Sequence, residues 1–267
     1  LPFFVLENIF NLAFTSSTHA SANPTKIPSF LELTFHYFKD YNRSNLATSD
    51  NITIRHFTDL IRIFHLQHPL ETRRHRDNKP AKYFPSVTEM LEAGVRIKVN
   101  TSKCLLDLRF SEGVLEIPQL EVEDSTEILF RNMIAFEQCY YLFESYITDY
   151  VTVLDFLINT NKDVDILVQN RVLVNWLGNS DSVTNLFNSL AKNVIHYRFS
   201  SDYSVLCKEL NDFCSHRWHK WKATLRQDYC NSPWQTAASI AGILLLILSL
   251  LQSICSVLQV VQQFNES

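Results

Sequence analysis

The sequence predicts a mainly α-helical fold: a multi-helix domain over residues 1–228, with a small antiparallel β-hairpin sheet and one C-terminal transmembrane helix. Three observations lead to this prediction. Apolar residues recur at helical spacing through most of the first 228 residues. The alternation typical of strands is confined to residues 95–117. Finally, residues 229–265 contain no Asp, Glu, Lys or Arg and are largely apolar, which is length enough to cross a bilayer.

The composition is that of a folded protein and argues against two classes of function. Hydrophobic residues make up 46% of the chain, and 19 phenylalanines against two methionines indicate a core rich in packed rings. Only four glycines occur, which argues against loops that cradle a phosphate or a nucleotide. A net charge of −4 gives no reason to expect nucleic acid as a partner. The six cysteines show no C-x-x-C spacing and are expected to be reduced thiols.

The first third of the chain predicts three helices joined by polar loops. The apolar pattern of Pro2–Ala13 predicts a short helix, and the Ser/Thr/Asn/Pro-rich stretch Thr15–Pro28 predicts a loop. Ser29 is expected to cap the second helix, and the apolar stripe of Phe57–Leu66 marks the third.

A stretch rich in histidine and arginine follows, and we expect an exposed linker near residues 66–84. His65, His68 and His75 lie in or beside it, together with several arginines. Neighbouring acidic residues dilute the positive charge, so we interpret this stretch as a solvated basic loop. A contact with a phosphate or an acidic partner is the alternative.

The middle of the chain carries the predicted β structure. Ser86 and Glu89 form a capping-box pattern, and Gly94 stands where the C-terminal cap of that helix belongs. Strands are expected at Val95–Val99, Leu106–Phe110 and Val114–Ile117, with a turn at Ser111–Gly113 and Pro118 at the strand end.

The rest of the domain is predicted to be helical. Asp124 and Glu127 are expected to open a helix that runs to Tyr140. Further helices are expected at residues 147–160, 163–169, 182–193 and 202–228. On the last, Cys207, Leu210 and Cys214 share an apolar face. The pattern Cys214-x-His216-x-x-His219 has the residue types of a zinc site, but a helix points Cys214 and His216 about 160° apart, which argues against it.

The tail predicts both a membrane anchor and its orientation. We expect a juxtamembrane segment at residues 229–235, a transmembrane helix at 236–261 and a short tail at 262–267, with Trp234 as an interfacial anchor. Four basic residues precede the span, namely Arg217, Lys220, Lys222 and Arg226. This bias places the N-terminal domain in the cytoplasm, as part of a single-pass protein. The glycosylation sequons at Asn42, Asn51 and Asn100 are then expected to stay unmodified.

Small residues follow one face of the predicted span. Gly242, Ser249, Ser253 and Ser256 fall on this face together with Ala238. Such faces allow close approach of two helices, so self-association through the span is a hypothesis. The alternative is that small residues are merely tolerated in a hydrophobic anchor.

The sequence nominates no catalytic, cofactor-binding or metal-binding residue. It lacks the G-x-S-x-G, phosphate-loop, G-x-G-x-x-G and H-E-x-x-H patterns. Cys139 is interpreted as a small core residue, not a nucleophile.

Several blocks, in order along the chain, resemble the plant domain-of-unknown-function 247 (DUF247, UPF0481-like) family. They are Leu1-Pro-Phe-Phe-Val-Leu-Glu7, Pro85-Ser-Val-Thr-Glu-Met-Leu-Glu-Ala-Gly-Val95, Leu105-Leu-Asp-Leu-Arg-Phe110, Gly113-Val-Leu-Glu-Ile-Pro118, Arg131-Asn-Met-Ile-Ala-Phe-Glu-Gln-Cys139, Asn175-Trp-Leu-Gly178 and Arg217-Trp-His-Lys-Trp-Lys-Ala-Thr-Leu225, followed by Asp228-Tyr and Pro233-Trp234. Cys230 departs from the aromatic residue expected there. The first block is internal in that family, so the resemblance implies that the family's N-terminal portion is missing here.

The resemblance implies a plant-specific, largely helical domain with a C-terminal anchor and no established enzymatic activity. Some grass members are associated with pollen self-incompatibility, which suggests recognition or signalling. Our sequence-based expectation is therefore a non-catalytic recognition or adaptor protein in the plasma membrane, with the endomembrane system as the alternative location. Its expected partners are the lipid bilayer and unidentified proteins, without a cofactor. The alternative function is a cryptic membrane-bound hydrolase or transferase.

Overall fold

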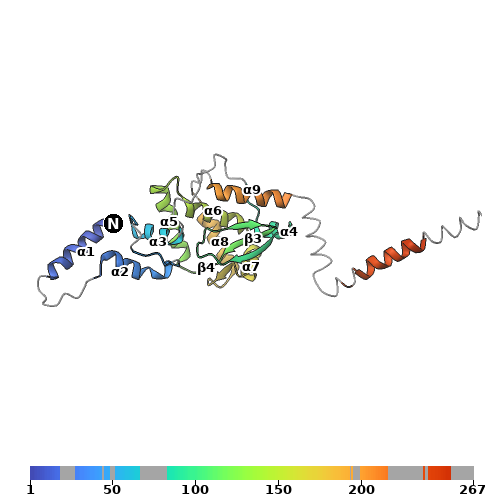
Figure 1. Cartoon of the computed structure of the whole chain (residues 1–267), viewed down its shortest axis with the longest axis horizontal. Helices are drawn as coiled ribbons and strands as arrows, with labels where there is room; N and C mark the ends of the chain where they lie inside the picture. The colour runs from blue at the N-terminus through green and yellow to red at the C-terminus, as the bar shows by residue number, and fades with distance from the viewer. Residues whose placement is uncertain are drawn as a thin grey trace, which may run out of the picture.

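The computed structural model describes residues 1–18, 28–43, 45–48, 52–66, 83–192, 194, 199–215, 237 and 240–253 (Figure 1). Within them the chain is mainly helical with two small β-sheets, which confirms the predicted class. The predicted linker near residues 66–84 lies outside the described residues over positions 67–82. At its two ends, Leu66 and Phe84 are buried in the core, and Tyr83 is exposed.

The N-terminal helices pack through aromatic rings. They are α1 (Phe3–Thr18), α2 (Phe30–Tyr37), the 3-10 helix η1 (Lys39–Tyr41) and α3 (Phe57–Leu66). The rings of Phe3 and Phe30 lie 5.1 Å apart, and Phe3 meets Phe57 edge-on. Ser29 caps α2, as the sequence predicts, and Glu32 completes a capping box that was not predicted. Helix α1 continues to Thr18, so the predicted start of the loop at Thr15 was wrong.

The first sheet is mixed, which corrects the prediction of a purely antiparallel sheet. Helix α4 (Val87–Glu92) precedes β1 (Arg96–Asn100), and β2 (Arg109–Ser111) and β3 (Val114–Pro118) form the predicted antiparallel hairpin. Its two-residue turn, Glu112–Gly113, has positive φ at both positions, as a type I′ turn requires. The strand order is β1-β3-β2, so β3 occupies the centre and runs parallel to β1. Ile97 and Leu115 pair there and are both buried.

A second sheet was missed by the sequence reasoning. Strand β4 (Leu120–Val122) pairs in parallel with β5 (Leu173–Asn175), a partner about 50 positions further along the chain. Each strand has only three residues, too few for alternation to stand out against the background. Only Gln119 separates β4 from β3, so the two sheets share one continuous stretch of chain.

Five further helices complete the described domain and enclose the main core. They are α5 (Thr126–Tyr140), α6 (Tyr146–Leu157), α7 (Asn161–Gln169), α8 (Ser180–Leu190) and α9 (Ser201–Ser215). In Figure 1, α9 lies across the body near α4, while α1 and α2 lie at the opposite end beside α3. Ser125, not Asp124, occupies the N-cap position of α5, so the predicted cap was wrong by one residue.

Asp163 joins two helix starts. One of its carboxylate oxygens accepts hydrogen bonds from the backbone N–H and the hydroxyl of Thr88 on α4, at 2.8 and 2.6 Å. The other accepts from the backbone N–H and hydroxyl of Thr160, at the N-terminus of α7. Burial acts to raise its pKa, but these four bonds outweigh it and hold the pKa of Asp163 below its usual value. The side chain thus fixes α4 against α7.

The C-terminal part of the description is the helical stretch 240–253, every residue of which is exposed. Among the residues that the structure describes, no helix is both long enough and apolar enough to cross a membrane.

Candidate functional site

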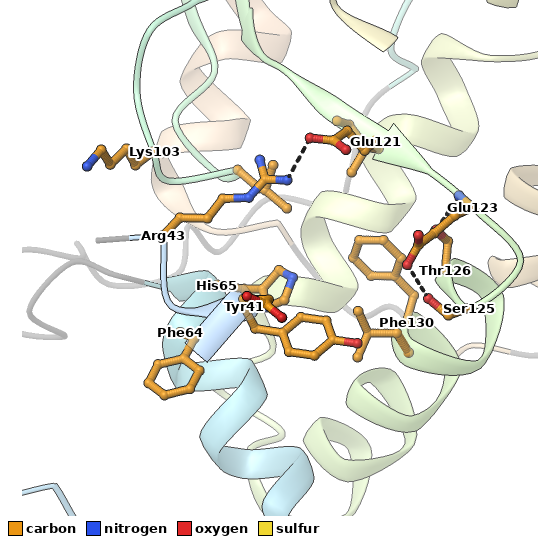
Figure 2. Close-up of a pocket in the computed structure, with 14 residues that line it drawn as sticks. Tyr41, Arg43, Phe64, His65, Lys103, Glu121, Glu123, Ser125, Thr126 and Phe130 are labelled. Atoms are coloured by element: carbon orange, nitrogen blue, oxygen red, sulfur yellow. Dashed lines mark hydrogen bonds and ion pairs between the residues drawn. The ribbon is translucent and has the colours of Figure 1, made fainter. Parts of the chain in front are cut away.

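A cavity of about 590 Å³ lies between α3, α5 and β4 (Figure 2). Its apolar floor includes Phe64 from α3, Phe130 from α5 and Leu120 from β4. Tyr41 of η1 also lines it, and its hydroxyl has no hydrogen-bond partner among the described residues. A volume of this size is within the range of small-molecule sites, although most of the other lining residues are polar or charged.

Acidic groups line one side of this cavity. Glu121 lies in β4 and Glu123 follows it, so strand alternation turns both side chains to the same, exposed face. Glu123 accepts a 2.5 Å hydrogen bond from the hydroxyl of Ser125, and its backbone N–H donates to the hydroxyl of Thr126. The start of α5 thus fixes the position of Glu123.

Basic groups also line the cavity. Arg43 approaches Glu121 at 3.4 Å, an exposed pair that is worth little energy by itself. Lys103 has no ion-pair partner among the described residues, and Figure 2 shows it on the same side of the cavity as Arg43, away from Glu123 and Ser125. The lining therefore mixes both signs of charge, since Arg43 meets Glu121 and Asp40 is a further carboxylate of the lining.

Two asparagine side chains hold the loops that present these cations. The amide of Asn42 donates to the carbonyl of Leu46 at 2.9 Å and accepts from its N–H at 2.8 Å, which closes the loop around Arg43. The amide of Asn100 donates to the carbonyl of Asp107 at 2.8 Å and accepts from Ser102 N–H. Both asparagines belong to glycosylation sequons, and in this structure their side-chain amide nitrogens donate hydrogen bonds within the fold.

His65 contributes an acceptor to the cavity and corrects one sequence-based expectation. It lies in the last turn of α3, not in a solvated loop, and Nδ1 bonds the carbonyl of Ile61 at 2.8 Å. Burial, assisted by the nearby Arg43 charge, lowers the pKa of His65. The ring is therefore neutral at pH 7, with Nδ1 as the donor and Nε2 as an acceptor that no described residue engages.

The groups around the cavity do not form a nucleophile–base pair among the described residues. Ser125 donates to Glu123, and His65 donates to Ile61. Figure 2 shows Ser125 and His65 well separated. Cys104 is buried, and its thiol faces the backbone carbonyls of His65 and Leu66, not the imidazole. Cys139 is exposed, so its interpretation as a core residue was wrong.

A buried ionic network also lies between α3 and α5 and was missed from the sequence. Arg62 is 2% exposed and Glu137 is fully buried, and the guanidinium Nε donates to the carboxylate at 2.8 Å. Arg62 also donates to the carbonyl of Glu144 at 2.6 Å and stacks over the ring of Tyr141 at 4.2 Å. Asp59 approaches Arg62 at 3.9 Å. This network joins α3 to α5 and to the turn before α6.

Glu137 is the acceptor at the centre of the network. Besides Arg62, it accepts hydrogen bonds from the backbone N–H groups of Ile147 and Thr148 and from the Thr148 hydroxyl. Burial raises the pKa of Glu137, while Arg62 and these donors oppose that rise by stabilising the carboxylate. Arg62 lies within the apolar stripe Phe57–Leu66 that predicts α3, and Glu137 lies within the family-like block Arg131–Cys139. Neither pattern predicts that the two residues pair across 75 positions.

The residues predicted to form the anchor are described only in part. Trp234, Ser256, Arg217, Lys220, Lys222 and Arg226 lie outside the described residues, as do His216 and His219 of the pattern with Cys214. Gly242, Ser249 and Ser253 belong to the stretch 240–253. Nothing in the described residues lies within 4 Å of a Cβ placed on Gly242, and the Ser253 hydroxyl bonds the Ser249 carbonyl of its own helix. Among the described residues no cluster of His, Cys, Asp and Glu suits a metal ion.

Comparison with known proteins identifies relatives in one plant family. UPF0481 protein At3g47200 of Arabidopsis thaliana is 25% identical over 283 residues, covering 97% of this chain and 58% of that protein. Putative UPF0481 protein At3g02645 of Arabidopsis thaliana is 26% identical over 170 residues, covering 63% of this chain and 32% of that protein. The chain thus spans little more than half the length of the first relative and about a third of the second.

No solved structure matches the chain significantly. The model of the DUF247 family, described as plant proteins of unknown function, matches residues 1–248. Since this match covers both the domain with the cavity and the start of the apolar stretch, the chain belongs to the DUF247 family of plant proteins.

Proposed function

We propose that the chain is a membrane-anchored, non-catalytic recognition protein, in which residues 1–228 form a cytoplasmic domain and residues 236–261 form the anchor. The observation that carries the proposal is the surface of the helical stretch 240–253. Six consecutive residues, Ile243–Leu248, are large, apolar and 49–67% exposed. At 3.6 residues per turn they cover every face of the helix. A helix that is apolar all round is favoured in a protein core or in lipid.

The neighbouring sequence extends this surface to the length of a membrane span. The described stretch alone would measure ~21 Å, short of a hydrocarbon core of about 30 Å. Residues 254–261 continue the apolar composition without a charge. The four basic residues of 217–226 then lie on the side of the domain, which favours a cytoplasmic orientation.

The geometry of the cavity favours recognition over catalysis. Its serine, histidine and neighbouring cysteine engage other groups instead of one another, as described above. What the cavity offers is a rigid arrangement of charges over an apolar floor, which is the arrangement of a binding site. Plasma membrane is the location we favour for the anchored protein.

The anchor is tested by extracting membranes from plant cells that express the tagged full-length chain. We expect the wild type to stay in the pellet at alkaline pH and to dissolve only in detergent. Replacing both Leu245 and Leu248 with Arg places two charges near the centre of the span, at about 3 kcal/mol each, and should move the protein to the supernatant. The matched control replaces the same two residues with Ile. Release of the wild type at alkaline pH, or retention of the double Arg variant, would contradict the proposal.

A further inference from the structure

The turn between α5 and α6 exposes three large, mainly apolar side chains, which we call the α5–α6 patch. Phe143 is 83% exposed, Tyr140 is 59% exposed and Leu142 is 53% exposed. Since a Phe or Tyr side chain covers about 150–250 Å² when it is fully buried, the three together offer roughly 400 Å². Single exposed apolar residues are ordinary, but a contiguous patch of this size often marks an interaction site.

The buried ionic network fixes the backbone that carries this patch. The Arg62 guanidinium donates to the Glu144 carbonyl at 2.6 Å and stacks over the Tyr141 ring at 4.2 Å. The backbone N–H of Tyr141 donates to the Glu137 carbonyl at 2.7 Å, and that of Glu144 donates to the Tyr141 carbonyl at 2.9 Å. The two apolar residues between Tyr141 and Glu144 are therefore presented on a fixed turn, so a complex that buries them loses little backbone entropy.

One cation and one anion flank the patch at its two ends. The Arg55 guanidinium lies over the rings of Tyr140 and Tyr141, at 5.8 and 5.1 Å from their centroids. Glu144 follows Phe143 at the other end of the turn and is exposed. Neither Arg55 nor Glu144 forms an ion pair within the described ranges of the chain. The patch thus has an apolar centre between two charges of opposite sign.

We propose that the α5–α6 patch is the interface of a two-fold dimer of this chain. A two-fold contact places the same surface on both copies in opposite directions, so the Arg55 end of one patch meets the Glu144 end of the other. Two ion pairs form in this way, one at each edge, while the apolar side chains meet in the centre. An apolar core inside a polar rim is the usual layout of a specific interface.

The area of the surface agrees with such a dimer. The start of α1 adjoins the patch, because the Phe3 N–H donates to the Arg55 carbonyl at 2.8 Å, and the next residue, Phe4, is 62% exposed. With Phe4 and the two flanking charges, each copy can bury roughly 700 Å², close to the about 800 Å² per partner of a standard interface.

The charges favour a second copy over a surface of one sign. An anionic membrane surface would pair Arg55 but leave Glu144 facing like charges, and a basic partner would do the reverse. A second copy supplies an opposite charge to both. The inference concerns the folded domain and does not depend on the proposed anchor.

The first test measures the mass of the full-length chain in detergent micelles by sedimentation velocity across a range of protein concentrations. We expect a dimer that dissociates on dilution. The double variant L142E/F143E places two carboxylates in the centre of the contact and should weaken dimerisation about a hundredfold or more. The matched control is W176E, because Trp176 is also a large exposed side chain, 67% accessible, on the loop after β5.

Exchange of the two flanking charges tests the two-fold pairing itself. R55E and E144R should each weaken the dimer about tenfold, because each brings like charges together at both edges. The double variant R55E/E144R restores opposite charges and should recover most of the wild-type affinity. The matched control is K208E/E209K, which exchanges two exposed charges on α9. Because the Arg55 charge also acts on the buried Asp59 carboxylate, melting curves establish that every variant is folded.

Three results would overturn the inference: a monomer at every concentration, a dimer that L142E/F143E leaves intact, or no recovery of affinity in R55E/E144R. The second result would assign self-association to another surface, such as the predicted span. Binding of vesicles of anionic phospholipid by a monomeric wild type but not by L142E/F143E would assign the patch to a membrane instead.

Membrane extraction of the same preparations keeps this inference separate from the anchor. A chain that stays in the membrane pellet but is monomeric contradicts the dimer alone. A dimer that is released at alkaline pH contradicts the anchor alone.

Discussion

Replacing Arg62 with Met should destabilise the N-terminal domain strongly. The guanidinium lies 2.8 Å from the Glu137 carboxylate, donates to the Glu144 carbonyl and closes on Asp59 at 3.9 Å, all in a buried site. Met preserves much of the apolar stem but leaves the buried Glu137 carboxylate without a cation and removes one of the two arginines that stabilise the Asp59 carboxylate. Breaking a buried ion pair at one partner costs about 3–5 kcal/mol. For a domain of this size the melting temperature should fall by roughly 10 °C, at about 2–4 °C per kcal/mol.

The stability lost in R62M should depend on pH, because the pKa of Glu137 changes when Arg62 is removed. Without Arg62, burial dominates and the pKa of Glu137 rises further above its usual value, so the folded variant binds a proton more readily than the unfolded chain. As the pH falls toward that raised pKa, protonation relieves the uncompensated charge. The gap between wild type and variant should therefore narrow from pH 8 to pH 5. The assay is scanning fluorimetry of the full-length chain in detergent at both pH values.

A double-mutant cycle separates pairing from packing. E137Q alone leaves the buried Arg62 guanidinium without its nearest carboxylate. The double variant R62M/E137Q removes both charges, so its loss of stability should be smaller than the sum of the two single losses by about 2 kcal/mol or more. R131M is the matched control, because Arg131 forms an exposed pair with Glu127 and should lose less than about 0.5 kcal/mol. A loss below about 1 kcal/mol for R62M, or additive losses in the cycle, would show that the Arg62–Glu137 pair does not support the fold.

Two further predictions concern local geometry. D163N should lower the free energy of unfolding by about 1.5–3 kcal/mol at pH 7, because it removes the charged acceptor shared by Thr88 and Thr160. Since the pKa of Asp163 is held below its usual value, the wild type loses this advantage as the pH falls below about 4. Equal stability of the wild type and D163N at neutral pH would contradict this role of Asp163. G113A should cost more than G178A, because both glycines have positive φ but only at Gly113 would the new Cβ lie 3.0 Å from the ring of Phe213. Urea unfolding measures the free energy of unfolding of both variants. Equal losses at the two positions would show that the Phe213 ring moves aside without destabilising the fold.

The sequence predicted best what depends on neighbours along the chain. The cap at Ser29, the capping box at Ser86 and the turn at Glu112–Gly113 all satisfy backbone groups a few residues away. The same local logic placed most helices within a few residues of their observed ends. It also placed Cys207 and Leu210 on the buried face of α9.

The contacts that form the candidate site were beyond such reasoning. The pairing of β4 with β5, and of Arg62 with Glu137, joins residues 50–75 positions apart, and a single sequence carries no signal of their proximity. The charged rim of the cavity was visible only as scattered exposed residues. The prediction for His65 was wrong for a related reason. Its charged neighbours in the sequence indicated a solvated loop, but the residue lies in the last turn of α3 and lines the cavity.

The most direct test of a cytoplasmic domain on a membrane anchor is its topology in sealed microsomes. The three sequons at Asn42, Asn51 and Asn100 serve as reporters, and the amides of Asn42 and Asn100 hold loops of the cavity. We expect the membrane-inserted chain to carry no glycan at these sites and external protease to digest the N-terminal domain without detergent. Glycosylation of any of the three, or protection of that domain until the membrane is dissolved, would contradict this topology.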